Sequence, residues 1–287
     1  MKKRATAFSL LLCAALLFSA CGGGKSPQKP AGESASASTT SASQTTDRTA
    51  APAPAKTGFQ KIGDMSDAWS ELYKQNEAVI NRYEGMPIMG LVTPPLTFVS
   101  GVQFDMLNMD NRDGRFEGKL MLAGYPGFVK KAGAKITFGS DRTLEKDGFG
   151  PSAKAGDRMV ESGSLALDQE HYITETFTER AGRKIHRGYT EFKRLADGSM
   201  ICLAMSGQTL NFRGDEELRD DVIYLHNGAG RYDFVIAKAQ TGPEFKSISF
   251  ADKGDLTKEQ AFELFKTAGY AIDQTGGIKD GKLVVDQ

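Results

Sequence analysis

The feature that most constrains the fold of this chain is a series of short β-type segments between residues 158 and 250. In most of them apolar and polar residues alternate, which is the two-residue period of a strand with one buried face. The breaks between them are short and contain Gly, Asp, Asn or Pro, which favour tight turns. Such breaks leave no room for a helical crossover, so neighbouring strands must pair antiparallel as a meander. The expected strands are 158–167, 171–180, 183–195, 199–206, 221–226, 231–239 and 245–250.

Further strands are expected before this region. Residues 98–109 and 115–123 flank Asp110-Asn111-Arg112-Asp113-Gly114, which indicates a hairpin because Asn, Asp and Gly tolerate positive φ. The same turn could also be interpreted as a calcium-binding loop of the EF-hand type. With Gly114 at the sixth position of that loop, the first ligand position would be Met109, which cannot coordinate calcium. A short strand at 134–138 and an exposed polar loop at 141–156 should follow.

Two helices are expected beside the strands. Ser66 can cap a helix that runs to about residue 82 or 83, with apolar residues at three- and four-residue steps and Asn76 as the one polar interruption. We expect this apolar face to dock on the sheet rather than on a partner. Near the other end of the chain, Thr257 and Gln260 match a capping box, and Gly269 closes the helix.

These elements, with a last strand at 282–285, predict one α+β domain over residues 59–287. Its mostly antiparallel sheet should have an N-terminal and a C-terminal helix. Nine or ten strands favour curling, so the sheet could be a half-barrel, a barrel or a sandwich.

The first 20 residues have the parts of an export signal peptide. Lys2, Lys3 and Arg4 are the cationic start, residues 5–18 are an apolar run, and the small Ser19-Ala20 suits a signal peptidase. This segment is too short to span a bilayer stably.

The residues Phe18-Ser19-Ala20-Cys21 resemble the lipobox of a bacterial lipoprotein, with Phe18 in place of the usual Leu. The resemblance implies that Cys21 is diacylated and becomes the N-terminus; each buried methylene of palmitate-like chains is worth about 0.8 kcal/mol. Gly22 replaces the Asp that often marks inner-membrane retention, which favours the outer membrane in a Gram-negative source. A Gram-positive source would place the protein on the outer face of its single membrane. The other interpretation is an ordinary secretory peptide with a Cys near its cleavage site.

Residues 21–58 should form a lipidated, disordered tether. From Gly22 to Gly58 they contain Ser, Ala, Thr, Pro, Gly and Gln but no Val, Ile, Leu, Met or aromatic residue, so they cannot bury enough apolar surface to fold. Such a coil would reach roughly 30 Å from the lipid surface. Gly22-Gly23-Gly24-Lys25-Ser26 resembles the end of a phosphate-binding loop, but Ser19 stands where its first Gly belongs.

Charge, hydropathy and cysteine content argue against nucleic-acid binding, a transmembrane helix and an internal disulfide. The chain has 36 basic and 36 acidic residues, and loss of the leader removes three of the basic ones. The mature chain is therefore slightly acidic, without the basic footprint of nucleic-acid binding. Outside the leader no apolar run is long enough for a transmembrane helix. With Cys13 removed and Cys21 lipidated, Cys202 is left without a disulfide partner, and its apolar surroundings indicate a buried thiol.

No catalytic motif is present, so no catalytic residue, cofactor or metal is assigned. The chain lacks Gly-x-Ser-x-Gly, His-Glu-x-x-His and Cys-x-x-Cys. Residues 148–153 imitate a dinucleotide fingerprint, but Pro151 interrupts it. His171, His186 and His226 lie on different expected strands and could in principle converge on zinc, although ordinary strand residues are the simpler interpretation.

One cluster of basic residues surrounds an expected hairpin tip. It could meet a phosphate or an anionic lipid head group, but a solvated strand edge with Glu175 and Glu179 nearby is the simpler interpretation. The cluster consists of Arg180, Arg183, Lys184 and Arg187.

A lipid anchor followed by a curled sheet and a helix resembles, in architecture and location only, the half-barrel lipoprotein carriers of the bacterial envelope. The resemblance implies a non-enzymatic protein that binds a lipid-like apolar ligand or another envelope component through the sheet. Such a lipid carrier should contain a continuous apolar cavity. The alternatives are a structural or protein-interaction lipoprotein without a small ligand and, third, a hydrolase.

Overall fold

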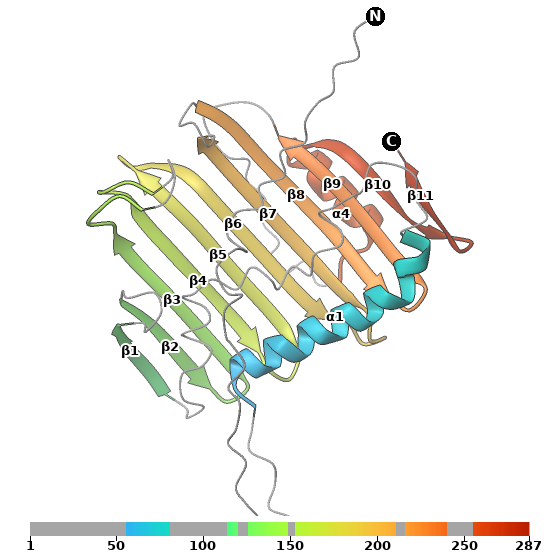
Figure 1. The fold of residues 1–287 in the computed structure, drawn as a ribbon, viewed down its shortest axis with the longest axis horizontal. Coiled ribbons are helices and arrows are strands. Elements are labelled where there is room, and N and C mark those ends of the chain that lie inside the picture. Colours follow the sequence, from blue (N-terminus) through green and yellow to red (C-terminus); the bar gives the residue numbers. More distant parts are fainter. Residues whose placement is uncertain are drawn as a thin grey trace, which may run out of the picture. The chain divides into compact units, whose positions relative to one another are not determined.

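Eleven strands, most of them from segments with a two-residue period, form one antiparallel sheet in the computed structural model of the chain (Figure 1). The structure describes residues 56–80, 114–119, 126–148, 153–210, 216–239 and 255–286, which belong to one unit, residues 55–287. The strands are β1 (Gly114–Lys119), β2 (Pro126–Ala132), β3 (Lys135–Thr143), β4 (Arg158–Ala166), β5 (His171–Arg180), β6 (Arg183–Arg194), β7 (Met200–Leu210), β8 (Glu216–Gly228), β9 (Arg231–Ala239), β10 (Ala271–Lys279) and β11 (Lys282–Asp286).

The strands lie in the sheet in the order in which they occur in the chain, and each neighbouring pair is antiparallel. The predicted antiparallel meander and the α+β class are therefore confirmed. The sheet curls but stays open, because its end strands β1 and β11 do not pair with each other. The described strands thus form neither a closed barrel nor a two-sheet sandwich.

Alternation along the strands divides the apolar side chains between the two faces of the sheet. On β7, Cys202 belongs to one hydrophobic cluster, and its neighbours Ile201 and Leu203 belong to another. On β9, Phe234 and Val235 are divided in the same way. The sheet therefore supports two separate cores.

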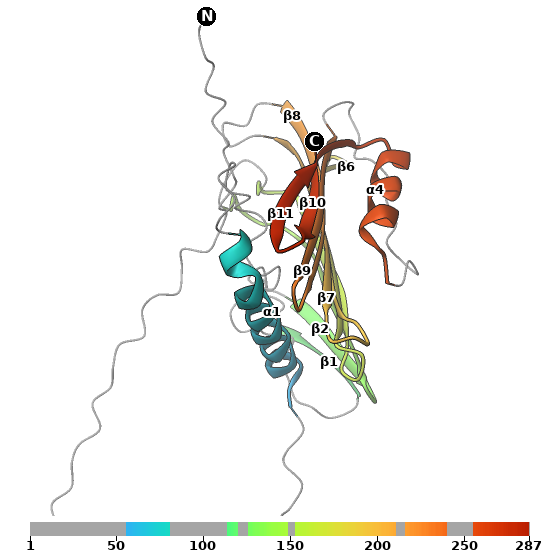
Figure 2. The ribbon, with the colours of Figure 1, turned by 90° about the vertical axis from the view of Figure 1, so that its right-hand side faces the viewer.

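Each core is completed by one helix (Figure 2). α1 (Gly58–Ile80) contributes Met65 and Trp69 to the cluster that contains Cys202, and we call that side of the sheet the α1 face. α4 (Lys258–Thr267) contributes Ala261 and Phe265 to the other cluster, on the side that we call the α4 face.

The N-terminus of α1 differs from the prediction. The helix begins eight residues before Ser66, which lies inside it and whose carbonyl accepts a hydrogen bond from the Ser70 hydroxyl. Thr57 provides the cap instead: the backbone N–H of Gln60 donates to Thr57 Oγ1, and the backbone N–H of Thr57 donates to Gln60 Oε1. The signal in the sequence was the Thr-x-x-Gln pattern, the same capping box that predicted α4.

The capping box of α4 is confirmed, with Thr257 and Gln260 exchanging the two expected hydrogen bonds. Strands β5 and β9 have the predicted boundaries, and β4, β6 and β11 differ by one residue. Strands β7 and β8 extend beyond the prediction, and β3 extends into the expected loop by residues 141–143.

Strands β2 and β10 were not predicted, and β10 follows α4 directly. β2 begins with Pro126-Gly127, and β10 contains Gly276-Gly277, residues that weaken a strand pattern. In β10 the ring of Phe234 fills the missing side-chain volume, since a Cβ on Gly276 would lie 2.7 Å from Phe234 Cζ.

Several predictions lie outside the described residues. They are the leader, residues 21–55 of the tether, the strands at 98–109 and 245–250, the turn at 110–113 with its calcium alternative, and residues 149–152 of the nucleotide-like pattern. The last part of the expected tether is described, and there the prediction is wrong, because Thr57 caps α1 and Gly58 is its first residue.

Candidate functional site

The described strands do not bring the three histidines together. His171 on β5 is opposite Lys193, whereas His186 on β6 is opposite Thr178, seven residues further along β5. At about 3.3 Å per residue these positions are roughly 23 Å apart. Among the residues that the structure describes, no three His, Cys, Asp or Glu side chains form a group that could hold a metal ion.

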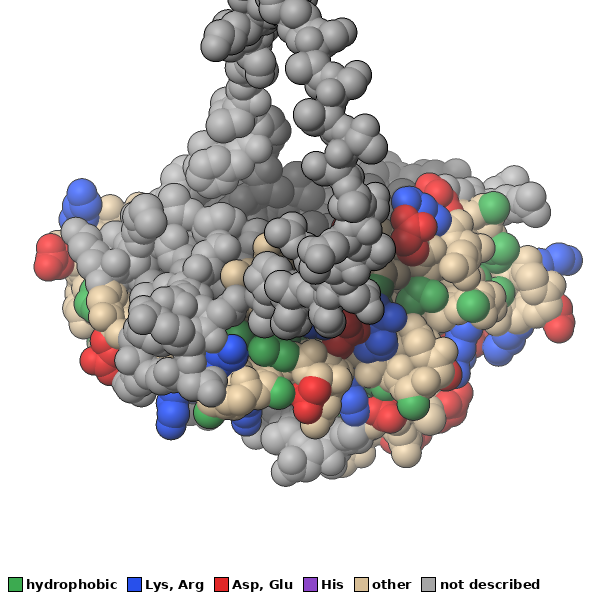
Figure 3. All heavy atoms as spheres, turned by 90° about the horizontal axis from the view of Figure 1, so that it is seen from below, with side chains coloured by type: hydrophobic (Ala, Val, Ile, Leu, Met, Phe, Trp, Pro, Cys, Tyr) green, Lys and Arg blue, Asp and Glu red, His purple; other side chains and the backbone are tan. Residues whose placement is uncertain are grey.

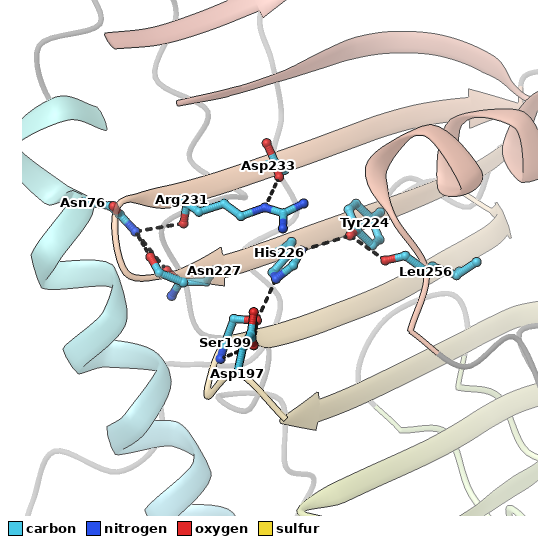
Figure 4. Close-up of polar contacts among 10 residues, drawn as sticks. Asn76, Asp197, Ser199, Tyr224, His226, Asn227, Arg231, Asp233 and Leu256 are labelled. Carbon is cyan, nitrogen blue, oxygen red and sulfur yellow. Dashed lines mark hydrogen bonds and ion pairs between the residues drawn. The ribbon is translucent and has the colours of Figure 1, made fainter. Parts of the chain in front are cut away.

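His226 instead forms a polar cluster with the turn between β6 and β7, in which His226 and Ser199 are buried and Asp197 is exposed (Figure 4). Its Nε2 lies 2.8 Å from the Ser199 hydroxyl oxygen, and that hydroxyl donates to Asp197 Oδ1 at 2.5 Å. The backbone N–H of Ser199 also donates to Asp197 Oδ1, at 2.9 Å. His226 is 4% exposed and Ser199 is 6% exposed, so the pair is shielded from solvent.

The direction of these hydrogen bonds decides what the Ser–His pair can do. A hydroxyl has one proton, and Ser199 gives it to Asp197, so Nε2 of His226 must be the protonated nitrogen that donates to Ser199. A serine nucleophile needs the opposite arrangement, in which the imidazole accepts the hydroxyl proton. Burial lowers the pKa of His226, and the two hydrogen bonds from Ser199 lower that of Asp197. The cluster therefore favours a neutral, structural histidine.

The cluster continues toward α4. The Tyr224 hydroxyl lies 3.5 Å from His226 Nδ1 and donates to the carbonyl oxygen of Leu256 at 2.8 Å. Leu256 directly precedes Thr257, the cap of α4. The buried polar groups therefore link the β6–β7 turn, β8 and the start of α4.

A second polar cluster fixes α1. Asn76, which is 1% exposed, donates through Nδ2 to the carbonyl oxygens of Gly228 at 2.8 Å and Arg231 at 3.0 Å. Asn227 donates back to the carbonyl oxygen of Trp69 at 3.0 Å. The sequence showed Asn76 only as a polar interruption of an apolar stripe; its partners lie about 150 residues away in the chain.

The basic cluster at the β5–β6 hairpin is joined to acidic groups. Arg180 makes two hydrogen bonds to buried Asp157, and Arg187 makes two to buried Asp220. The Arg180 guanidinium lowers the pKa of Asp157. Lys184 lies over the ring of Phe177, 4.6 Å from its centroid. Carboxylates thus neutralise Arg180 and Arg187, which argues against a phosphate site. The expected solvated strand edge is wrong, because β5 and β6 are inner strands of the sheet.

One hollow bounded by described residues is an open depression of about 660 Å³. It lies where the β4–β5 and β6–β7 turns meet the start of α1. Ion pairs line it: Glu170 is paired with Lys61 and Arg194, and Lys193 with Asp255 at 2.5 Å. Figure 3, a view from the edge along which α1 lies, shows acidic and basic side chains intermingled over the described surface. The depression thus has a mixed lining, in which these ion pairs lie beside Leu167, Leu195 and Ala196.

The other surface feature is the part of the α4 face that no described helix covers. The helix α4 contacts β8, β9 and β10. On β2–β5 the strand register identifies the side chains of the same face, and these are exposed or half-buried. We call this surface the open patch; it is formed by Phe128, Lys130, Thr137, Asp141, Val160, Ser162, Ser164, Ile173, Glu175 and Phe177.

The predicted site residue Cys21 lies outside the described residues, so its lipidation stays a prediction. Cys202 is 1% exposed in the α1-face core, and burial raises the pKa of its thiol. Within the described ranges no helix is long and apolar enough to cross a membrane. No protein-family model, curated protein or solved structure matches the chain.

Proposed function

We propose that this protein is a bacterial envelope lipoprotein that is anchored through Cys21 and binds another envelope component through its sheet, without catalysing a reaction. The lipobox-like residues 18–21 and the apolar-poor segment 22–55 support an anchor followed by a tether. In a Gram-negative source, Gly22 favours the outer membrane as the site of the anchor.

The observation that carries the binding role is the open patch. A sheet face packed on a core is normally apolar, and the α4 face is apolar where α4 covers it. The open patch instead combines half-buried Phe128 and Phe177 with exposed Lys130, Ser162 and Glu175. Aromatic side chains within a polar surround are typical of surfaces that bind other proteins.

An envelope macromolecule suits this geometry better than a lipid-like ligand. A lipid would need a largely apolar cavity, whereas the open depression of about 660 Å³ has ion pairs in its lining. A lipid-like ligand is the alternative, because the open, curled sheet with α1 packed on one of its faces resembles half-barrel carriers in architecture, although α4 covers part of the other face. We infer that this sheet serves as such a half-barrel scaffold.

The anchor is tested by Cys21→Ser in the full chain. We expect the variant to leave the membrane fraction while its circular dichroism spectrum stays unchanged, because the substitution removes only the acylated sulfur. Ala20→Ser, which keeps small size and the cysteine, is the matched control and should stay in the membrane fraction. Equal membrane association of all three proteins would contradict the anchor.

The binding role is tested by placing a photocrosslinking amino acid at Ser162 or Glu175 in cells. Glu77, exposed on α1, is the control position. We expect one envelope protein, identified by mass spectrometry, to be crosslinked from both patch positions and not from Glu77. Lipid adducts at the patch would favour the lipid-carrier alternative, and equal products from all three positions would contradict a specific surface.

A further inference from the structure

The sheet ends at β11, and among the described residues no strand pairs with its outer edge. β10 and β11 are joined by Asp280-Gly281, both at positive φ (49° and 69°), and the closing residues are Lys279 and Lys282. In such a two-residue turn the backbone N–H of the residue after the loop donates to the carbonyl oxygen of the residue before it. The backbone N–H of Lys282 therefore points toward β10. Because this direction alternates from one residue to the next, the N–H groups of Leu283 and Val285 point away from β10, toward the outer edge.

The sequence of β11 is complementary to itself when two copies run antiparallel. With Val284 at the centre, Val284 is opposite the same residue of the second copy. Leu283 is then opposite Val285, and Lys282 is opposite Asp286. This register places the outward-facing backbone groups of Leu283 and Val285 against each other as hydrogen-bonded pairs.

The same register also suits the side chains. Lys282, Val284 and Asp286 share the α4 face, because Val284 is paired with Gly277, which is paired in turn with Asp233 of that face. In the self-paired arrangement these three residues occupy non-hydrogen-bonded positions, where opposite side chains approach most closely. A Lys282–Asp286 ion pair would form at each end, with two valines between them.

We propose that β11 is a self-association edge through which two copies of this chain pair antiparallel about Val284. A lysine on an edge strand normally discourages pairing with another sheet. Here Asp286, whose side chain is 45% exposed and lies 3.8 Å from Lys279 of its own chain, supplies the opposite charge. A five-residue edge is small compared with a stable interface, so the association is weak and is best tested by trapping it.

The test uses the full chain with Val284→Cys and an added mild oxidant. The oxidant accepts the two electrons that are released when two thiols form a disulfide. In the proposed register the Cα atoms of the two substituted residues would lie about 4.5 Å apart, within the range of a disulfide. Lys282→Cys is the matched control on the same face, because its two copies would be four residues out of register and about 13 Å apart. The unsubstituted chain measures any background from the native cysteines, of which Cys202 is buried.

We expect disulfide-linked dimers on non-reducing gels for V284C and at least tenfold less for K282C. Adding Asp286→Lys to V284C should abolish the dimer by opposing two lysines, and adding Lys282→Glu as well should restore it. Absence of a V284C dimer, or equal crosslinking of V284C and K282C in folded protein, would overturn the proposal. Crosslinking of V284C to a different protein would also overturn it, because the edge would then serve another strand.

Discussion

The ring of Phe138 on β3 occupies the space above Gly163 on β4. A Cβ on Gly163 would lie 2.3 Å from Phe138 Cζ and 2.6 Å from the carbonyl oxygen of Ile173. The glycine therefore lets a large aromatic ring lie over the neighbouring strand within the α1-face core, where Phe138 is 1% exposed.

Gly163→Ala should consequently destabilise the fold. The added methyl group meets both a buried ring and backbone, so we expect a loss of about 1–3 kcal/mol in the free energy of unfolding, measured by urea titration. Gly118→Ala on β1 is the control, because a Cβ there meets no atom within 4 Å. Equal stability of the two variants would contradict the tight packing.

Asn76→Ala should loosen α1 from the sheet. The substitution leaves the carbonyl groups of Gly228 and Arg231 without their side-chain donor, which we expect to cost about 1–3 kcal/mol of stability. Gln75→Ala, at an exposed position of the same helix, should change stability little. Hydrogen exchange of α1 amides would show the effect directly, and unchanged protection in the Asn76 variant would exclude this role.

Two of the histidines should make stability depend on pH. Burial lowers the pKa of both His186 and His226 in the folded state. As pH falls below about 6.5, the unfolded chain takes up protons that the folded chain does not, so the free energy of unfolding decreases until pH falls below the lowered values.

Urea titrations at pH 7.5 and 5.0 would measure this decrease. His226→Gln keeps an N–H donor for Ser199 and should reduce the decrease, and the double variant with His186→Gln should reduce it further. A double variant with the same decrease as the unsubstituted protein would contradict the assignment.

Cys202 should be unreactive in the folded protein. The thiol is buried and its pKa is raised, so a thiol reagent should label it only in denaturant. In denaturant the mature lipidated chain should then show one reactive thiol, and a mature chain with free Cys21 should show two. Labelling of Cys202 under native conditions, identified by mass spectrometry, would contradict its burial.

The sequence determined much of the local structure because local signals sufficed. Ala181-Gly182 closes β5 and β6 with φ of 49° and 76°, as the turn chemistry predicted, and the Thr257–Gln260 box starts α4. β10 was missed because its glycines weaken the strand pattern and Phe234, a residue distant in the chain, packs over Gly276 in their place.

The sequence alone also indicated the antiparallel pairing of strands that short turns join, such as β4 with β5, β5 with β6 and β8 with β9, since short turns permit no other pairing of neighbours. Only the tertiary structure decided that the sheet stays open, that its faces form two cores, and that Asn76 and His226 are buried links to the helices. These properties depend on which distant atoms meet. The proton direction in the Asp197–Ser199–His226 cluster and the register available at the edge of β11 follow from positions in space, and no local pattern of residues specifies them.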